Sequence, residues 1–515
     1  MKRILVVAGS DSSGGAGLEA DQKVIAAHGC YAMTATAALT AQNTQGVYAI
    51  HEVPSAFVQK QIDACYDDVG VDVLKSGMLA SLQTVLVLAN AMRQHKIPVS
   101  VVDPVMVSTS GAQLLPEKAV KVLCAEVLPL TTICTPNIPE ANLMLQKCGK
   151  RPIDIRDLDD IKTLAAEVHS LGSQYVLLKG GHLPLTADYK VAQTEAEKKI
   201  VTNVLFGGDS VDVIEFPYQK TKHTHGTGCS LASALACNLA LGLDMLESVV
   251  AASRYVDAGI KNAVKIGCGS GPINHFHSLQ IMPFAPGGFV DYVLDRYDVQ
   301  PVWQEYTHHE FVQRMGDGTL PQHLYAQYMI QDYHYLVQFA RANSLAGYKA
   351  KNIDDIVAAA QIVTHIRNEM DLHINECKGL GMTREMMDQC EESQACTAYS
   401  RYVLDIGQSE DWLALQISLL PCLLGYGMIA RRLKEQQRTN PPKNRNRYLT
   451  WIENYVGDDY TSAVKTGCAL IETHASKQSP HRIEELVKIF IHATKMETGF
   501  WNMAARPEWS TLPQK

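Results

Sequence analysis

The chain has few features that would place it outside the ordinary globular proteins. Charged residues make up only 19% of its 515 positions, and the net charge of −8 argues against a nucleic-acid partner. None of the 13 cysteines stands three positions after another, so the Cys-x-x-Cys pair of many zinc sites is missing. We therefore expect reduced, mostly buried thiols in a cytoplasmic protein that binds no nucleic acid.

Long apolar runs are also scarce. The first run, residues 4–8, is too short for a signal peptide. The longest apolar stretch, residues 413–430, contains Gln416, Ser418 and Pro421, which favours a buried core helix over a membrane span. We expect no membrane partner, and we find no internal repeat or low-complexity tract.

The first half of the chain alternates short apolar runs with helical segments. The apolar runs are residues 4–8, 99–102, 132–135 and 175–178. Such runs are typical of buried parallel strands, and their alternation with helices indicates βαβ units. We predict an α/β domain over residues 1–280, with a central, mainly parallel sheet covered by helices.

The second half is helical almost throughout. Its helical segments are residues 324–341, 353–378, 413–433 and 482–504. Prolines and glycines between residues 283 and 288 indicate a connection between the two halves. We predict a linker at residues 281–290 and an all-α domain at residues 291–515.

A glycine-rich loop, residues 9–17, follows the first predicted strand and precedes a helix. Such a loop lets the backbone approach a ligand closely. It matches neither Gly-x-Gly-x-x-Gly nor the phosphate-binding loop that ends in Gly-Lys-Ser/Thr. By itself, the loop is equally consistent with a tight turn between a strand and a helix that binds no ligand.

A second glycine motif, Gly226-Thr227-Gly228-Cys229, opens a helix of small and apolar residues. Free N–H groups and the helix dipole make such a start an anion site, which could stabilise a phosphoryl group during transfer. We expect a lowered pKa for Cys229 at this helix start, so that it could act as a base. The motif alone favours a glycine turn with an inert buried cysteine.

Seven segments of the first half, in the same order, give the chain its resemblance to a known family. They are residues 8–17, 40–44, 75–79, 102–106, 135–141, 179–182 and 224–229. The region resembles the hydroxymethylpyrimidine and hydroxymethylpyrimidine-phosphate kinases of the ribokinase-like superfamily, although that family usually has a proline where Ser12 stands. A cysteine at position 229 in place of the aspartate of sugar kinases points to vitamin kinases, among which pyridoxal kinase is the nearest alternative.

The resemblance implies a role for each matching position. The aminopyrimidine would be bound by Gly9, Asp21, Gln42, Met78 and Val105. ATP and its phosphates would be bound by Lys179, Thr221, Gly226, Thr227 and Gly228. Mg²⁺ would be held by Asp103, Asn137 and Glu140, whose hard oxygens suit it, and Cys229 would stand at the position of the catalytic base.

The helical half places polar groups at helical spacing within apolar segments. The pairs are Asp332 with Tyr335, Cys422 with Tyr426, and Glu497 with Phe500. Members of a pair share one helix face, and a buried carboxylate needs a partner, so a polar pocket inside a bundle is one interpretation. Spacing alone favours scattered core tyrosines and satisfied polar groups. His308, His309 and His373 lack metal-ligand spacing and are expected to be surface or core residues.

This half is similar to the thiaminase II (TenA) family, an all-helical fold like that of haem oxygenase. The matching segments are residues 316–321, 331–336, 398–400, 420–426, 451–455 and 497–501. The resemblance implies cleavage at the methylene carbon attached to a 4-aminopyrimidine, with Cys422 as nucleophile and Glu497 as proton donor. The ring would be bound by Asp332, Tyr335, Tyr399, Tyr426, Tyr455 and Phe500. The leaving group would be the thiazole of thiamin or ammonia from an aminomethylpyrimidine.

Together the halves resemble the fungal fused enzymes of thiamin synthesis and salvage, with ATP and Mg²⁺ as cofactors and small pyrimidines as substrates. The helical half would release hydroxymethylpyrimidine, and the kinase half would phosphorylate it twice. The alternative is a pyridoxine-type vitamin kinase fused to a regulatory or assembly module that binds pyrimidine without turnover. Because TenA-type domains often form symmetric oligomers, we also expect a homo-oligomer.

Overall fold

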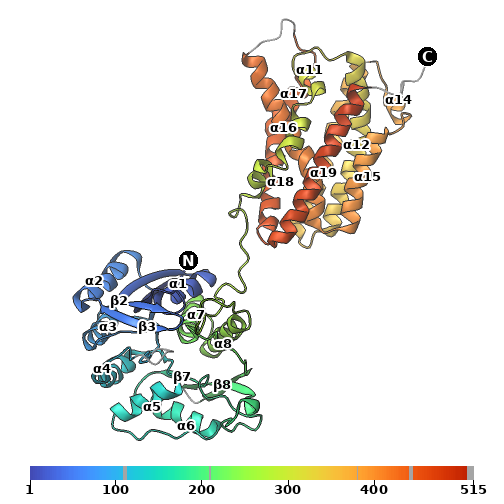
Figure 1. The fold of residues 1–515 in the computed structure, drawn as a ribbon. Helices are drawn as coiled ribbons and strands as arrows, with labels where there is room; N and C mark the ends of the chain where they lie inside the picture. Colours follow the sequence, from blue (N-terminus) through green and yellow to red (C-terminus); the bar gives the residue numbers. More distant parts are fainter. Residues whose placement is uncertain (108–112, 208–209, 380, 440–444, 507–515) are drawn as a thin grey trace. The chain divides into compact units, whose positions relative to one another are not determined.

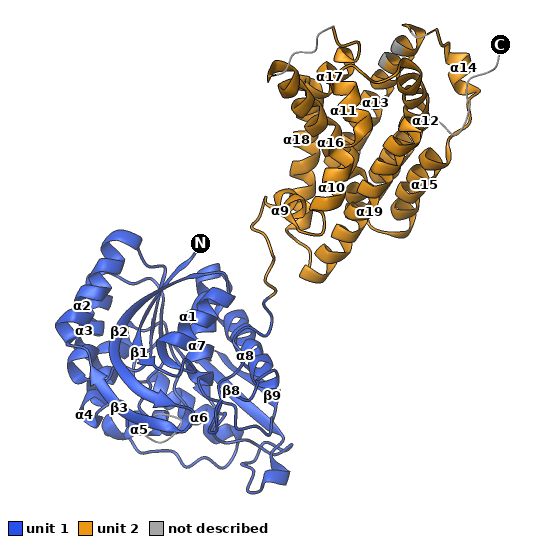
Figure 2. Ribbon diagram, turned by 45° about the horizontal axis from the view of Figure 1, so that its top comes forward, with its two compact units in different colours: residues 1–279 blue, residues 280–515 orange. Residues whose placement is uncertain are grey.

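The computed structural model describes residues 1–107, 113–207, 210–379, 381–439 and 445–506. The chain divides into two compact units, Met1–Leu279 and Gln280–Lys515 (Figure 2). The division falls one residue before the boundary predicted from the sequence. The first helix of the second unit, α9, begins at Phe289, inside the range predicted as a linker.

The first unit is built on one sheet, which has nine strands within the described residues, in the order β3-β2-β1-β4-β5-β6-β7-β8-β9 (Figure 1). The strands are β1 (Arg3–Asp11), β2 (Tyr31–Asn43), β3 (Gly46–Glu52), β4 (Val73–Ser76), β5 (Ser100–Val102), β6 (Ile133–Cys134), β7 (Tyr175–Lys179), β8 (Ile200–Gly207) and β9 (Ser210–Pro217). Neighbours from β2 to β7 are parallel, whereas β3, β8 and β9 pair antiparallel at the two edges. The predicted, mainly parallel sheet is therefore confirmed.

Helices cover both faces of this sheet. They are α1 (Gly17–Ala27), α2 (Ser55–Ala64), α3 (Leu82–Gln94), α4 (Glu117–Val122), α5 (Ile138–Lys147), α6 (Leu158–His169), α7 (Thr227–Leu241) and α8 (Met245–Lys261). In β1, Leu5 and Val7 pack into the core under α2–α6, while Ile4 and Val6 pack into the core under α1, α7 and α8. Burial on both faces explains why this strand is a continuous apolar run.

The strands β2, β3, β4, β8 and β9 were not predicted from the sequence. In β2, buried positions alternate with partly exposed ones and are filled mostly by alanine, threonine and methionine. Such a strand shows no apolar run, because only one side of it is packed into the core.

The second unit is all-helical in its described part, as predicted. Its helices are α9 (Phe289–Asp295), α10 (Gln300–Thr307), α11 (Glu310–Gly316), α12 (Gln322–Lys349), α13 (Ile353–Gly379), α14 (Arg384–Asp388), α15 (Gln394–Ser409), α16 (Trp412–Thr439), α17 (Leu449–Val456), α18 (Asp458–Ala475) and α19 (Pro480–Ala505). Helices α12, α15, α16 and α19 pack against one another around one apolar core.

Helix α16 is, among the described residues, the one helix long and apolar enough to cross a membrane. However, 78% of its most apolar window is buried inside the bundle. Its apolar character therefore matches the core position predicted from the sequence.

Two candidate active sites

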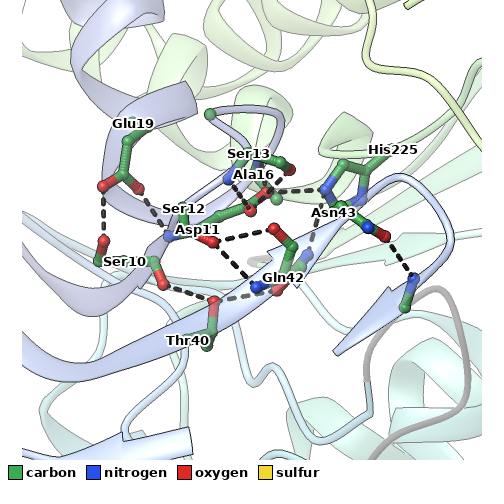
Figure 3. A network of polar contacts seen from close by, with 12 residues as sticks. Ser10, Asp11, Ser12, Ser13, Ala16, Glu19, Thr40, Gln42, Asn43 and His225 are labelled. Atoms are coloured by element: carbon green, nitrogen blue, oxygen red, sulfur yellow. Dashed lines mark hydrogen bonds and ion pairs between the residues drawn. The ribbon is translucent and has the colours of Figure 1, made fainter. Parts of the chain in front are cut away.

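The loop after β1 is organised by the side chain of Asp11 (Figure 3). One carboxylate oxygen accepts hydrogen bonds from the N–H and hydroxyl of Ser13, at 2.9 and 2.7 Å. The other accepts from the N–H of Ala16 at 2.9 Å and lies 2.8 Å from Nε2 of His225. Burial raises the pKa of Asp11, but the hydrogen bonds from His225 and Ser13 outweigh it and lower that pKa to about 2. Asp11 thus remains charged and holds the loop to the start of α7.

The two glycine motifs lie in direct backbone contact. Gly226 has a φ of +80°, and a Cβ placed on it would collide with the carbonyl oxygen of Gly15. A Cβ on Gly15 would in turn press against the imidazole of His225. Only glycine permits this approach, because its missing side chain leaves room and its backbone tolerates positive φ.

A cavity of about 500 Å³ opens between these motifs. Gly9, Gln42, Met78 and Val105, which were predicted to bind the pyrimidine, line it. The predicted nucleotide residues and metal ligands line it too: Lys179, Thr221, Gly226, Thr227, Gly228, Asp103, Asn137 and Glu140, together with Cys229. Gln42 is held from two sides, since Thr40 donates a 3.2 Å hydrogen bond to its Oε1 and its Nε2 lies 3.3 Å from His225 (Figure 3).

Asp21, which was predicted to bind the pyrimidine, does not line this cavity. Its carboxylate is fully buried, and both of its oxygens lie 2.9 Å from Nζ of Lys75. The hydroxyl of Ser233, on α7, donates to it at 2.7 Å. Asp21 sits on the inner face of α1, which packs onto the sheet and α7, so its side chain points into the core.

Acidic and amide groups also line the cavity, and Asp103 lies close to Gly228 of the glycine motif. Asn137 and Glu140 cap α5 reciprocally: the N–H of each donates to the side chain of the other at 2.8 Å. Nζ of Lys179 lies 2.7 Å from Asp103. Burial raises the pKa of Glu140 to about 7, which Lys179 opposes and Asp103 reinforces. The described residues contain no group of three or more His, Cys, Asp or Glu side chains that could hold a metal ion by themselves.

The expected lowering of the Cys229 pKa is wrong. Burial raises the pKa of this thiol to about 11, since the nearby Lys75 offsets the effect of burial only in part. Asp21 and Asp103 raise it further. The cost of desolvating the Cys229 thiolate therefore outweighs the stabilisation that the start of α7 gives it. Cys229 is a neutral thiol at pH 7.

In the second unit, five helices bring the predicted ring-binding residues together. Asp332 and Tyr335 come from α12, Tyr399 from α15, Tyr426 from α16, Tyr455 from α17, and Phe500 from α19, and all are buried. The rings of Tyr335 and Tyr399 stack with centroids 4.9 Å apart, and those of Tyr426 and Tyr455 lie 5.1 Å apart. The tyrosines are therefore gathered in one cluster and not scattered through the core, and the polar pocket remains a prediction.

Cys422 of α16 and Glu497 of α19 stand within this cluster. The hydroxyl of Tyr399 donates a 2.8 Å hydrogen bond to Oε1 of Glu497. Burial raises the pKa of Glu497 to about 8, against the opposing hydrogen bonds of Tyr399 and Cys422. Burial and the nearby Glu497 raise the pKa of Cys422 well above its usual value. At neutral pH the pair therefore consists of a carboxylic acid and a thiol.

Two residues of this site were missed in the sequence, His373 and Glu369, one turn apart on α13. Nε2 of His373 lies 2.7 Å from Oδ2 of Asp332, and the hydroxyl of Tyr455 donates to Oε1 of Glu369 at 2.8 Å. Both contacts are made to residues that were predicted to bind the pyrimidine ring, Asp332 and Tyr455. The four-residue spacing of Glu369 and His373 places both residues on one helix face. It does not identify the residues that they contact.

The comparisons with known proteins agree with this geometry. An α/β unit with a cavity between two glycine motifs, followed by a helical bundle with a second polar site, defines a small-molecule kinase fused to a helical domain. Residues 11–274 match the phosphomethylpyrimidine kinase family, and residues 296–507 match the TENA/THI-4/PQQC family. The chain belongs to the phosphomethylpyrimidine kinase family and carries a TenA-family domain behind the kinase domain.

Full-length relatives share this arrangement. The chain is 43% identical over 498 residues to the putative hydroxymethylpyrimidine/phosphomethylpyrimidine kinase 2 of Schizosaccharomyces pombe, covering 96% of this chain and 90% of that one. It is 34% identical to the hydroxymethylpyrimidine/phosphomethylpyrimidine kinase THI20 of Saccharomyces cerevisiae, over 98% of this chain and 96% of that one. The predicted kinase–TenA fusion of thiamin biosynthesis is therefore confirmed, and a pyridoxine-type kinase is not favoured.

Proposed function

We propose that the α/β unit transfers phosphate from ATP to 4-amino-5-hydroxymethyl-2-methylpyrimidine and then to its monophosphate. We further propose that the helical unit hydrolyses thiamin or an aminomethylpyrimidine to the same hydroxymethylpyrimidine. The observation that carries the first part is the single cavity that joins Gln42 to the glycine motif at α7. The observation that carries the second is the neighbouring pair Cys422 and Glu497 within the aromatic cluster.

In the kinase site, positioning and charge stabilisation carry phosphoryl transfer. Gln42 would bind the amino and ring nitrogen groups of the pyrimidine, and the free N–H groups at Gly226–Gly228 would receive the phosphoryl oxygens. Cys229 would enter as a thiol beside the reacting hydroxyl. Because a neutral thiol cannot accept a proton, the proton of that hydroxyl would pass to an oxygen of the transferred phosphoryl group as the new O–P bond forms and the bond to ADP breaks.

Mg²⁺ fits the acidic end of this cavity, although no protein cage is present there. Mg²⁺ is commonly held by one or two carboxylates together with substrate phosphates and water. Asp103, Glu140 and the amide of Asn137 would hold it, and it would offset the charge of the phosphate oxygens. A carboxyl with a pKa near 7, such as that of Glu140, loses its proton readily when a cation arrives.

In the helical site, covalent catalysis would divide one hard substitution into two easier steps. The sulfur of Cys422 would add to a ring carbon of the pyrimidine as its thiol proton passes to the adjacent ring nitrogen, and the bond between the methylene carbon and the leaving group would then break. Glu497, which holds a proton at neutral pH, would give it to the departing amine of an aminomethylpyrimidine, whereas the thiazolium of thiamin would leave as a neutral thiazole without taking up a proton. Water would take the vacated position on the methylene carbon before the sulfur leaves the ring.

The test of the hydrolase proposal is Cys422→Ser, compared with Cys468→Ser on α18 as a matched control. Hydrolysis should fall by about a hundredfold or more in the first variant and stay unchanged in the second, while both still bind hydroxymethylpyrimidine. If protein that carries Gln42→Ala in the kinase cavity still binds the pyrimidine but hydrolyses neither thiamin nor the aminomethylpyrimidine, the helical unit is a binding module. A homo-oligomer and a cytoplasmic location remain predictions, to be tested by sedimentation and by cell fractionation.

A further inference from the structure

Tyr306 of α10 is buried in the helical unit, and the reaction proposed above does not use it. Its side chain is fully enclosed, and its hydroxyl has no hydrogen-bond partner among the residues that the structure describes. A buried hydroxyl without a partner is costly, because it has given up its hydrogen bonds to water. A molecule from outside the chain, a water or a ligand, would satisfy it.

Tyr306 lies against the turn of α16 that follows Cys422. Its ring and hydroxyl fill the space in which a Cβ on Gly425 would stand. Gly425 follows Cys422 by three positions, so the two residues share one face of α16. A glycine leaves room there for the phenol, because it has no side chain. The Tyr306 hydroxyl is thereby brought to the helix face that carries the proposed nucleophile.

Two tryptophans pack on the ring of Tyr306. Trp303, one turn earlier on α10, meets it edge-on with ring centroids 5.5 Å apart, and Trp501 of α19 stacks on it with centroids 6.3 Å apart. Both indoles are buried. Trp501 follows Glu497 by four positions, so it lies on the helix face of the proposed proton donor. Tyr306 thus packs between the two helices that carry Cys422 and Glu497.

The charges that act on Tyr306 are those of the reacting groups. Burial raises the pKa of Tyr306 well above its usual value, and Glu497, Cys422 and Tyr399 raise it further. The phenol therefore keeps its proton at neutral pH, and its oxygen can both donate and accept a hydrogen bond. Glu497 is already engaged by the hydroxyl of Tyr399 and by the thiol of Cys422. The Tyr306 hydroxyl is left for a bound molecule.

We propose that the Tyr306 hydroxyl binds the water molecule that replaces the leaving group in the helical site. The proposal rests on the proposed hydrolysis and concerns its second half, after the amine has left. Glu497, which is then a carboxylate, takes one proton of the water as the water oxygen bonds to the methylene carbon. The second hydrogen stays on that oxygen, as the hydroxyl of the product, and is held by the oxygen of Tyr306. The sulfur of Cys422 then leaves the ring carbon, and the proton on the adjacent ring nitrogen returns to it.

A bound water explains how the site can favour water over other nucleophiles. The methylene carbon becomes electrophilic when the amine departs, and it would react with any nucleophile that reaches it. Water is a weak nucleophile, but a water already placed beside Glu497 has the advantage of proximity and orientation. Without the hydroxyl of Tyr306 this advantage is reduced, and a stronger nucleophile such as a small thiol competes for the same carbon.

The test compares hydrolysis with capture by an added thiol in the full-length protein. 4-Amino-5-aminomethyl-2-methylpyrimidine is incubated with increasing concentrations of 2-mercaptoethanol, and mass spectrometry measures the ratio of the thioether product to hydroxymethylpyrimidine. The variants are Tyr306→Phe, which removes only the hydroxyl, and Tyr402→Phe as a matched control. Tyr402 lies on α15, where its hydroxyl donates to the backbone carbonyl of Ile489 at 3.4 Å.

In the unaltered protein and in Tyr402→Phe, we expect hydroxymethylpyrimidine as the main product at every thiol concentration. In Tyr306→Phe, the ratio of thioether to hydroxymethylpyrimidine should rise by about tenfold, which is the effect expected from the loss of one hydrogen bond. The KM for the pyrimidine should change little, because the hydroxyl acts after the ring has bound. An unchanged product ratio in Tyr306→Phe, whether or not the rate falls, would overturn the proposal and leave the proposed function intact. If the unaltered protein forms neither product, the proposed hydrolysis fails, and this proposal fails with it.

Discussion

Nζ of Lys75 lies 2.9 Å from both carboxylate oxygens of Asp21, and neither side chain is exposed to solvent. This ion pair joins β4 to α1, and Ser233 ties it to α7. It lies next to Cys229, whose thiolate form Lys75 favours. The pair thus packs next to the kinase site without lining its cavity.

Removing one partner of this pair should destabilise the kinase unit. Lys75→Met leaves a buried carboxylate without its cation, which typically costs about 3–5 kcal/mol of the free energy of unfolding. The double variant Asp21→Leu/Lys75→Met should recover most of that loss, because two apolar groups replace two charges. Urea unfolding of the three proteins measures both effects. Normal stability in an Asp21→Asn variant that no longer binds pyrimidine would restore Asp21 as a substrate contact.

Gly226→Ala should abolish kinase activity. The added Cβ would collide with the carbonyl oxygen of Gly15 and separate the two glycine motifs that frame the cavity. Gly242→Ala is a matched control, since its φ is +96° but its Cβ would meet nothing within 4 Å. The Gly242→Ala variant should lose about 1–2 kcal/mol of the free energy of unfolding and keep its kinase activity. Equal kinase activity in the two variants would contradict the role given to the contact.

Cys229 should react slowly with iodoacetamide at pH 8. Its pKa of about 11 leaves little thiolate there, so the rate should continue to rise as the pH approaches that value. Cys268 is exposed and should be alkylated first. Peptide mapping by mass spectrometry separates the two positions. Rapid labelling of Cys229 at pH 7 would show instead that the helix start dominates its pKa.

Hydrolysis of the aminomethylpyrimidine by the helical unit should fall as the pH rises through about 8, because Glu497 then loses the proton that the departing amine needs. Glu497→Gln should lower the rate by about a hundredfold or more.

The same group should make stability depend on pH. The pKa of Glu497 is raised from 4.5 to about 8 on folding, so the stability it contributes is complete below pH 4.5 and is lost as the pH rises through 8. In Glu497→Gln this loss should vanish, which unfolding at pH 5 and pH 9 would measure. If the free energy of unfolding of Glu497→Gln falls equally steeply between pH 5 and pH 9, Glu497 is not the group responsible.

The sequence predicted the strands of the first unit where buried positions are mostly apolar, whereas the fully buried β4, which carries Lys75 and Ser76, was not found. The first apolar run became β1, and the glycine motif before residue 229 became the start of α7. The half-buried β2 left no apolar run, so it was not found. Boundaries of the short strands differ from the prediction by one residue, as in β5, because apolar residues continue beyond the paired ones.

The sites show a different limit. The types and order of the residues predicted almost all of the residues that line the cavity. They did not predict which charged side chains pair with one another across the fold. The ion pair of Asp21 was not foreseen, because its partner Lys75 is 54 positions away. The same reason explains why His373 was missed, since its contact with Asp332 spans 41 positions. The pKa of Cys229 was wrong because burial, which the motif does not show, outweighs the helix start.

The central claim is that one chain makes hydroxymethylpyrimidine at one site and phosphorylates it at another. The most direct measurement is one incubation of the protein with 4-amino-5-aminomethyl-2-methylpyrimidine, ATP and Mg²⁺, followed by mass spectrometry, for the unaltered protein and Cys422→Ser. We predict the hydroxymethylpyrimidine diphosphate from the unaltered protein. From Cys422→Ser we predict none, unless hydroxymethylpyrimidine itself is supplied. Unchanged aminomethylpyrimidine with the unaltered protein would contradict hydrolysis of that substrate, and hydroxymethylpyrimidine without phosphate would contradict the kinase assignment.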